Sequence, residues 1–489
     1  MAADTELAFT PAYQLRKLIG EKRLSPVELT EACIRRIESL NPRLNAFLTI
    51  AADHALADAR EAEHAVVRGD PLGPLHGIPI SLKDLEPAKG IRCTRGSLVF
   101  RDWIADRDEI AVERLKKAGA IVVGKTNTPE FGRLGTTENR LGDDCRNPWN
   151  PAATSGGSSG GAAASVAAGM VPIAQGSDGG GSIRIPSSFC GVFGIKATQG
   201  RVPRRSQGVA SWHPVNFSCV GPMTRNVRDA AIMLRVLAGP ADDAENTTLR
   251  DVPPDYESIV FGDARASEDG PGTSMKGVRV AWCPEFGGAA VDPEIRQQVE
   301  SSVQAFERMG ATVEPVGVDL EIDWLWQTYY TITAVKTAFA FGALFEQRGD
   351  LLTDYVKGDV AWGRRTAIDR YHRALCELEQ YRGSIAELFQ RFDLLMSPTT
   401  AVAAFPCRKN PGLIGGKHVA ARWGFYPFTF PFNMAGNPAA NVPCGFTREG
   451  LPVGLQIVGR KGDEVSVLRA SAAFETERPW AGRKPELSP

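Results

Sequence analysis

The sequence predicts an α/β fold in which helices cover a largely parallel or mixed β-sheet. Residues 111–124 have the pattern of a helix followed, after Gly119, by a short buried strand, and residues 293–316 repeat that order. Units of this kind place helices against a central sheet. Two late apolar runs, 440–446 and 452–458, flank a turn and predict an antiparallel pair, so we expect a mixed sheet.

The first predicted helix covers residues 25–40. The sequence Ser25-Pro-Val-Glu28 has the form of a capping box with proline at the first helical position. Apolar residues then recur at helical spacing, namely Leu29, Cys33, Ile34, Ile37 and Leu40. We therefore expect an amphipathic helix that buries this stripe.

The later elements follow in the same way. Residues 111–118 predict a helix and 120–124 a buried strand, while 293–309 predict a helix and 312–316 a strand. The turn at 448–450, Arg-Glu-Gly, predicts a hairpin between the two late strands.

Length and charge limit the possible classes of protein. The chain has 489 residues, with 56 basic and 57 acidic side chains and a formal net charge of −1. A prior of about 150 residues per domain suggests about three domains, but large α/β enzymes form one unit, and we expect a single domain over residues 1–489. The balanced charge, without long runs of one sign, gives no indication of a nucleic-acid or anionic membrane partner.

The cysteines and apolar segments predict a compartment. The first residues lack the basic and apolar regions of a secretory signal, and the weakly polar stretch 162–174 is too short for a membrane-spanning helix. Nine cysteines are scattered without CxxC or metal-type spacing. We therefore expect reduced thiols, no metal site and a cytoplasmic protein.

Two glycine-rich turns and one lysine are the most informative features. The sequence GGSSGG carries Ser158, GSDGGGSIRIP carries Ser182, and GIPISLKD places Lys83 at the end of an apolar run. Both glycine clusters are flanked by apolar and small residues, which disfavours a flexible linker.

These residue types suit nucleophilic attack on a carbonyl group. A serine hydroxyl is a weak nucleophile and needs a base within hydrogen-bond reach. Burial of Lys83 in its apolar run would lower the pKa of its amine, because desolvation disfavours the ammonium form. Lys83 then serves as the base, Ser158 as the bridge that relays the proton and Ser182 as the nucleophile. Surface pairing of Lys83 with Asp84 is the alternative, which the two serine motifs disfavour.

The second turn also predicts an anion-binding site. Four successive backbone N–H groups can converge on an oxyanion, those of Gly179, Gly180, Gly181 and Ser182. Asp178 and Arg184 flank the turn, and we expect them to form an ion pair that supports it structurally. Ser159 remains an alternative bridge, because spacing alone does not distinguish it from Ser158.

Other candidate groups are less favourable. His76 lies close to Lys83 in the sequence, but a catalytic role for it is disfavoured. Cys145 and Cys190 lie near the glycine-rich motifs, yet the six scattered histidines provide no Cys/His pair for a thiol nucleophile. A nucleotide-binding module is disfavoured because G-x-x-x-x-G-K-[ST] does not occur.

The motifs resemble those of the amidase signature family over most of the chain. The matching segments are residues 73–84, 137–139, 146–151, 156–161, 176–186, 191–196, 221–225 and 450–459. The resemblance implies an α/β/α sandwich with a large mixed, mostly parallel central sheet. It also implies a triad of Ser182, Ser158 and Lys83, a cis peptide between Gly157 and Ser158, and chemistry without a cofactor or metal.

Two departures from the family pattern lie outside the triad. Gly179 stands where the family commonly has threonine or another residue with a side chain, which is expected to widen or loosen the oxyanion turn. Leu85-Glu-Pro87 follows Lys83-Asp84 in place of the more usual asparagine-containing segment.

Aromatic residues give clues to the substrate. One dense set lies in a predicted helical region: Trp324, Trp326, Tyr329, Tyr330, Phe339, Phe341 and Phe345. A second set lies in a segment where Pro427 and Pro431 predict an extended loop: Trp423, Phe425, Tyr426, Phe428, Phe430 and Phe432. Trp212 and Phe217 are placed to cap the cleft. Such stripes usually fill a core, but here they favour an apolar or aromatic substrate over a small charged one.

The leading hypothesis is a stand-alone hydrolase that cleaves C–N bonds of amides, including anilides and nylon-type oligomers, through an acyl-enzyme. A urethanase with the same triad is the first alternative, and the amidase subunit of a glutamine-dependent tRNA amidotransferase is the second. The expected partner is a small amide or carbamate, and the sequence allows a homodimer.

The catalytic core is expected at about 70–230, and a surface connection at 240–275 leads to a second portion at about 275–489 that completes the sheet and the substrate cleft.

Overall fold

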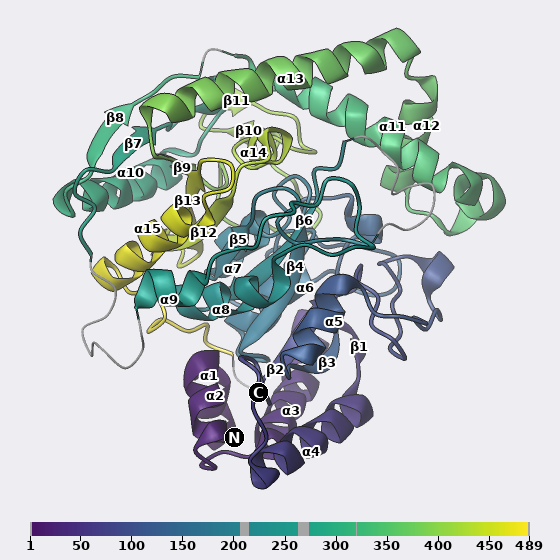
Figure 1. Cartoon of the computed structure of the whole chain (residues 1–489). Helices are drawn as coiled ribbons and strands as arrows, with labels where there is room; N and C mark the ends of the chain where they lie inside the picture. The colour runs from purple at the N-terminus through teal and green to yellow at the C-terminus, as the bar shows by residue number, and fades with distance from the viewer. Residues whose placement is uncertain (1, 206–214, 263–272, 319, 488–489) are drawn as a thin grey trace.

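The structure, a computed structural model, describes residues 2–205, 215–262, 273–318 and 320–487. Its strands are β1 (Phe47–Ile50), β2 (Pro79–Lys83), β3 (Ile121–Thr126), β4 (Ile173–Asp178), β5 (Phe193–Lys196), β6 (Cys219–Thr224), β7 (Arg279–Trp282), β8 (Thr312–Pro315), β9 (Leu394–Pro398), β10 (Leu413–Ile414), β11 (Lys417–His418), β12 (Ala439–Phe446) and β13 (Pro452–Gly459). All except β10 and β11 form one eleven-stranded sheet in the described chain, in the order β1-β3-β2-β4-β6-β5-β12-β13-β9-β7-β8 (Figure 1).

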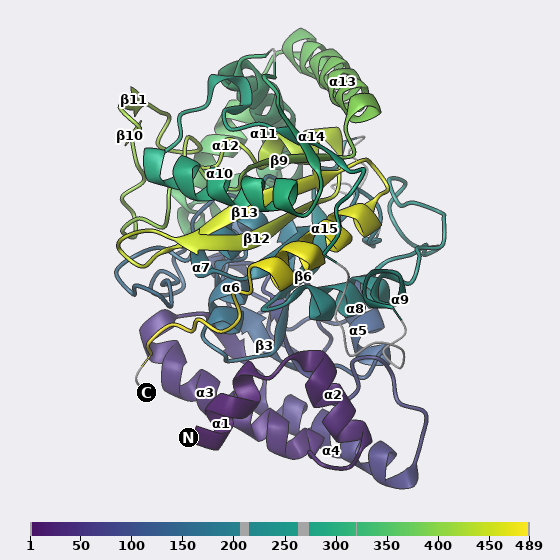
Figure 2. The same ribbon diagram turned by 90° about the vertical axis from the view of Figure 1, so that its left-hand side faces the viewer.

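Helices surround this sheet. They are α1 (Ala2–Phe9), α2 (Ala12–Gly20), α3 (Pro26–Leu44), α4 (Ala52–Arg68), α5 (Ile110–Lys117), α6 (Gly160–Ala167), α7 (Arg184–Cys190), α8 (Val227–Leu237), α9 (Tyr256–Phe261), α10 (Pro293–Arg308), α11 (Ile322–Arg348), α12 (Asp354–Arg365), α13 (Ile368–Arg391), α14 (Phe430–Ala435) and α15 (Glu464–Glu477). Figure 2 shows α10 and α15 lying along the β12–β13 hairpin. None of the described helices has the length and apolar character needed to cross a bilayer.

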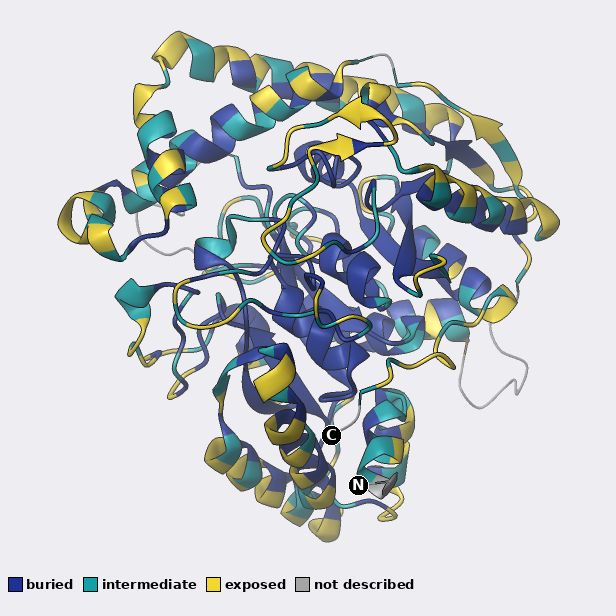
Figure 3. Ribbon diagram, turned by 180° about the vertical axis from the view of Figure 1, so that it is seen from behind, coloured by how far each residue is buried: buried dark blue, intermediate teal, exposed yellow. Residues whose placement is uncertain are grey.

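The sheet separates two layers of core, because successive strand residues point to opposite faces. In β3, Val122 belongs to a cluster with residues of α5, α8, α10 and α15, whereas Ile121 and Val123 belong to a cluster with residues of α3, α4 and α6. In β9, Leu394 joins the first cluster and Leu395 packs with α7, α13 and α14. Buried residues accordingly fill the inner strands of the sheet, and exposed residues lie on the edge strand β8 and on the outer helices (Figure 3). The α/β/α sandwich is confirmed.

The mixed character of the sheet is also confirmed, with one refinement. Parallel pairing joins β2 to β3, β2 to β4, β7 to β8 and β7 to β9. The other six neighbours in the large sheet are antiparallel, so antiparallel pairs outnumber the expected parallel ones. One reason is the tight hairpin between β12 and β13, since a short turn can join only antiparallel strands.

The predicted helices and strands form where the sequence places them. In α3, Ser25 Oγ accepts hydrogen bonds from the N–H groups of Val27 (3.0 Å) and Glu28 (3.3 Å), and the helix continues beyond the expected end to Leu44. The helix–strand units appear as α5 with β3 and α10 with β8. The late strands pair as β12 and β13.

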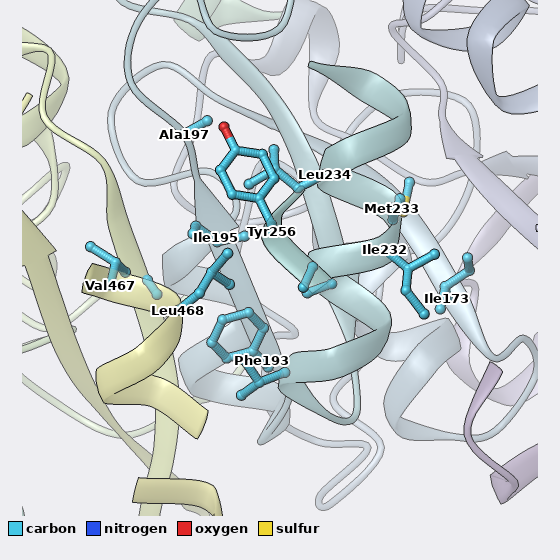
Figure 4. Close-up of a cluster of buried hydrophobic side chains, with 14 of the residues drawn as sticks. Ile173, Phe193, Ile195, Ala197, Ile232, Met233, Leu234, Tyr256, Val467 and Leu468 are labelled. Carbon is cyan, nitrogen blue, oxygen red and sulfur yellow. The ribbon is translucent and has the colours of Figure 1, made fainter. Parts of the chain in front are cut away.

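The predicted surface connection at 240–275 is wrong for part of its length. Helix α9 forms inside it, capped by Asp255, and inserts Tyr256 and Val260 into the core. Figure 4 shows Tyr256 among Phe193, Ile195 and Leu234. The sequence did not predict this helix, because the residues around it are mostly polar and only two of its own side chains are buried.

Candidate active site

The fold brings together three polar residues from separate segments. Lys83 ends β2, Ser158 lies just before α6, and Ser182 lies between β4 and α7. Strands β2 and β4 pair in parallel, so their carboxyl ends meet at one edge of the sheet. Such an edge is the usual place for a site in an α/β sheet.

Lys83 contacts Ser158 directly. Its Nζ lies 2.7 Å from Ser158 Oγ and 3.2 Å from the Ser177 carbonyl oxygen, and its side chain is fully buried. Burial lowers the pKa of the Lys83 amine to about 7, although Glu86 and Asp178 oppose this effect. A substantial fraction of the amine is therefore uncharged at neutral pH and able to accept a proton.

The structure distinguishes the two candidate bridges. Ser159 Oγ donates to the Ser177 carbonyl oxygen (3.1 Å) and accepts from the Ser177 N–H (3.3 Å), so it is committed to the backbone of β4. Ser158 is the serine whose hydroxyl reaches Lys83. The peptide bond between Gly157 and Ser158 is cis, as the family resemblance implies.

Ser158 and Ser182 line the same cavity, which has a volume of about 170 Å³. The two serine segments also touch through the backbone, since the Ser159 N–H donates to the Ser182 carbonyl oxygen (3.1 Å). A larger hollow of about 820 Å³, between Glu138 and Arg408, is lined by none of the three predicted residues. The small cavity is thus the one that the serine motifs define.

The turn at 179–182 contains three of the four expected donors. Gly181 is a correction, because its N–H donates to Asp178 Oδ1 (2.7 Å) and it does not line the cavity. Within the described chain, the N–H groups of Gly179, Gly180 and Ser182 donate to no protein acceptor. Gly179 and Gly180 line the cavity beside Ser182. These three N–H groups remain available to a negatively charged oxygen.

Two hydroxyl groups hold this turn, and the sequence did not predict either contact. Tyr329 Oη donates to the Gly179 carbonyl oxygen (2.9 Å), and Thr429 Oγ1 donates to the Gly180 carbonyl oxygen (2.8 Å). Because the C=O and N–H of a trans peptide point in opposite directions, the Tyr329 bond fixes the direction of the Gly180 N–H. The sequence analysis placed Tyr329 only in a set of aromatic residues, and it predicted no role for Thr429.

Glycine at 181 is required by this packing. Its φ is +126°, and a Cβ there would lie 2.2 Å from Thr429 Oγ1. Position 179 differs, because a Cβ would meet only Ser218, at 3.8 Å. The absent side chain at Gly179 therefore widens the cavity toward Ser218, in line with the departure seen in the sequence.

The predicted ion pair between Asp178 and Arg184 is confirmed. Arg184 Nη2 lies 2.9 Å from Asp178 Oδ1, and both side chains are fully buried. Burial alone would raise the pKa of Asp178, but the adjacent Arg184 guanidinium outweighs it and holds that pKa well below its usual range. Arg184 also donates to Gln456 Oε1 and Asn433 Oδ1, so the pair ties the turn to the second half of the chain.

The two aromatic sets pack against each other. Trp326 on α11 stacks on Trp423 at 5.0 Å, and most rings fill the core. Tyr329 and Tyr426 reach the small cavity. The second set is not an extended loop throughout, since Pro431 lies in the first turn of α14. Trp212 lies outside the described residues.

A second cavity adjoins the first. It has a volume of about 390 Å³ and is lined partly by Phe217 and Phe341. The two cavities share Leu85, Phe131, Arg133, Ser177, Gly179 and Ser218, so they form one cleft with a narrow inner and a wide outer part. Phe131 stacks on Phe341 at 4.1 Å and was not predicted.

The less favoured candidates lie outside this cleft. His76 Nε2 is 2.9 Å from the Ala62 carbonyl oxygen, and His76 lines neither part of the cleft. Burial raises the pKa of Cys145 to about 12, which keeps it a thiol at neutral pH. Within the described residues, no group of three or more His, Cys, Asp or Glu side chains could hold a metal ion.

Comparisons with known proteins show what the chain is similar to. A family model described as Amidase matches residues 28–468. The chain is 37% identical to an acylamidase of Rhodococcus erythropolis, over 99% of this chain and 98% of the relative. It is 35% identical to the A subunit of the glutamyl-tRNA(Gln) amidotransferase of Moorella thermoacetica, over 99% of each protein. The structure of a bacterial aryl acylamidase of the amidase signature enzymes superimposes with a TM-score of 0.89 and 30% identity, over 97% of each chain.

Proposed function

The chain belongs to the amidase signature family and is a hydrolase of C–N bonds in amides, and we propose that Lys83, Ser158 and Ser182 carry out this hydrolysis. The observation that carries the proposal is the 2.7 Å contact between the buried Lys83 amine and Ser158 Oγ, beside a cavity that Ser182 also lines. This arrangement supports a route from a base to a nucleophile through one hydroxyl group, because Ser158 and Ser182 line the same cavity.

The proposed reaction moves one proton along this chain. Uncharged Lys83 takes the proton of Ser158, which takes that of Ser182, while Ser182 Oγ bonds to the carbonyl carbon. The N–H groups of Gly179, Gly180 and Ser182, which line the same cavity, are the donors for the developing oxyanion in this proposal. Collapse of the intermediate breaks the C–N bond, and the proton returns through Ser158 to the leaving nitrogen. Water then attacks the acyl-enzyme by the same route and releases the acid.

The lining of the cleft supports apolar or aromatic substrates. Phe131 and Tyr426 border the inner part, and Phe217 and Phe341 border the outer part. A carbamate passes through the same tetrahedral intermediate, so a urethane remains a substrate to be tested.

We also propose a reducing compartment, the cytoplasm, since all nine cysteines are free thiols.

The identity to the A subunit of a glutamyl-tRNA(Gln) amidotransferase supports a second candidate, the release of ammonia from glutamine for a partner protein. One experiment separates the candidates: the purified chain alone is incubated with aliphatic amides, anilides, carbamates and glutamine. We expect anilide hydrolysis without any partner, and loss of that activity in Ser182→Ala. If glutamine is the one compound in this panel that the chain hydrolyses, the second candidate is favoured. If Ser182→Ala keeps the wild-type rate, the assigned nucleophile is wrong.

A further inference from the structure

The outer part of the cleft contains a lysine that the reaction does not use. Lys336 lies on α11, seven residues after Tyr329, which corresponds to about 10 Å along the helix. Both residues face the cleft, Tyr329 in the inner cavity and Lys336 in the outer one. The same face of α11 contributes Ile332, Thr333, Thr337, Ala340 and Phe341 to the outer cavity. Lys336 therefore lies on a helix face that carries apolar and threonine side chains, at a distance from the reacting groups.

Lys336 has a polar partner but no ion pair within the described chain. Its Nζ lies 3.3 Å from Asn216 Oδ1, and none of the described carboxylates comes within ion-pair distance of it. Glu245 is the acidic group that faces it, but Glu245 Oε1 accepts a hydrogen bond from Asn216 Nδ2 (2.6 Å). Burial, followed by repulsion from Arg204, lowers the pKa of Lys336 to about 8, so the side chain is mainly cationic at neutral pH.

The other described cations that line this cavity already interact with carboxylates or aromatic rings. Arg133 pairs with Asp359 (2.8 Å), and Arg205 pairs with Glu113 (2.6 Å). Three further charged groups line the cavity with partners of their own. Arg204 lies 3.9 Å from Glu86, Arg95 lies over the rings of Phe100 and Trp103, and the Glu109 carboxylate accepts from the N–H groups of Ile110 and Arg205. Among the described residues that line this cavity, Lys336 is thus the cation with neither a carboxylate at ion-pair distance nor an aromatic face against it.

We propose that the outer cavity binds a carboxylate carried by the substrate, with Lys336 as its partner. A partly buried cation without a carboxylate at ion-pair distance is unfavourable, and a substrate carboxylate would supply the missing charge. Leu85 and Phe131, the apolar side chains that line both parts of the cleft, fit a ring or alkyl spacer between the carboxylate and the amide. The substrate class is therefore amides that bear a terminal carboxylate across such a spacer. This inference rests on the proposed function, because it assigns a second contact to the same substrate.

The test compares an acid with its neutral isostere. The ratio of kcat/KM for 4-acetamidobenzoate to that for 4-nitroacetanilide is measured in the wild type, Lys336→Met and Lys336→Arg, because nitro and carboxylate groups have the same shape but differ in charge. A second pair, glutaric acid monoanilide and hexanoic acid anilide, places the carboxylate on the acyl side. We expect one of the two ratios to fall about 10- to 100-fold in Lys336→Met, the loss typical of a hydrogen bond to a charged group, and to be largely kept in Lys336→Arg.

The matched control is Lys357→Met. Lys357 lies on α12, pairs with Asp354 (2.9 Å) and lines neither part of the cleft, so its loss should leave both ratios as in the wild type. Ratios that stay the same in Lys336→Met would overturn the inference while the anilide activity still supports the proposed function.

A binding measurement makes the inference independent of turnover. Calorimetric titration of 4-acetamidobenzoate and glutaric acid monoanilide into Ser182→Ala should give a weaker Kd for one of them when Lys336→Met is added. If the Lys336→Met substitution changes the Kd of neither compound, the carboxylate site is overturned. Wild-type protein that hydrolyses none of the four amides, yet binds the acid in a manner dependent on Lys336, would count against the proposed function alone.

Discussion

At the scale of single residues, the charge of Lys83 should set the acid limit of activity. Its pKa lies at about 7, and only the uncharged amine can accept a proton. Below that pH the ammonium form dominates, so kcat/KM should fall about tenfold for each pH unit lost, and it should level off above about pH 8. A neutral anilide is the substrate to use, because the charge of Lys336 then has no carboxylate to meet. A flat profile between pH 5.5 and 8.5 would contradict a role for this amine as the base.

Tyr329 is a positioning residue for the oxyanion turn. Its hydroxyl holds the Gly179 carbonyl oxygen, and through that peptide it directs the Gly180 N–H. Tyr329→Phe removes one hydrogen bond and keeps the ring, so kcat should fall about 5- to 10-fold while KM changes little. The control is Tyr381→Phe, since Tyr381 Oη is buried without a hydrogen-bond partner in the described chain. A rise in KM with unchanged kcat would show that Tyr329 binds substrate instead.

The residues of the site were predictable where local sequence determines their surroundings. Lys83 ends an apolar strand, so its burial follows from the pattern around it. Gly181 was assigned wrongly because its N–H is taken by Asp178, whose side chain folds back over the turn. Tyr329 and Thr429 reach the turn from positions about 150 and 250 residues away, and no local pattern reports such contacts.

At the scale of elements, the Arg184–Asp178 pair joins β4, α7 and α14. Arg184→Met would leave the Asp178 carboxylate buried without its partner, a change that typically costs about 3–5 kcal/mol. We expect a loss of that size in the free energy of unfolding, measured by urea denaturation. Arg279→Met, which breaks a partly exposed pair with Asp393, should have a much smaller effect. Similar losses in both variants would show that burial of the Arg184 pair has no special weight.

Helices with strong apolar periodicity or clear start residues were predictable. Examples are α3, which Ser25 caps, and α10, which begins at Pro293. Two short helices were not. In α14 the prolines favoured an extended loop, but Pro431 occupies the first turn, where its missing N–H costs nothing. In α9 six residues are too few to show a period, and the helix is recognisable only by the buried Tyr256.

At the scale of the whole molecule, the two portions of the chain build one sheet and one site. The first portion supplies Lys83, Ser158 and Ser182, and the second supplies Tyr329 and Thr429, which hold the turn. The fold class followed from helix–strand order, and the α/β/α arrangement from the family resemblance. The sheet order could not be derived, because β5 pairs with β12 across about half of the chain and only tertiary packing determines that choice.

Helix α15 contacts the start of α8 through a partly buried acid. Glu475 on α15 accepts a hydrogen bond from the Val227 N–H (3.0 Å) at the start of α8, and burial raises its pKa to about 8. The folded protein therefore keeps the proton of Glu475 up to about pH 8, whereas the unfolded chain loses it near its ordinary pKa of 4.5. Stability from this group is fully present below pH 4.5 and is lost as the pH rises through about 8.

Glu475→Gln removes that titration and keeps an uncharged acceptor for the Val227 N–H. Between pH 6 and pH 8.5 the wild type should lose about 1–3 kcal/mol of unfolding free energy relative to the variant. Asp229, whose pKa burial also raises, is present in both proteins, and its charge helps to raise the pKa of Glu475, so the difference between the two profiles includes this interaction. Denaturant unfolding at the two pH values measures the effect, and stability profiles that run parallel would show that Glu475 is ionised in the folded protein.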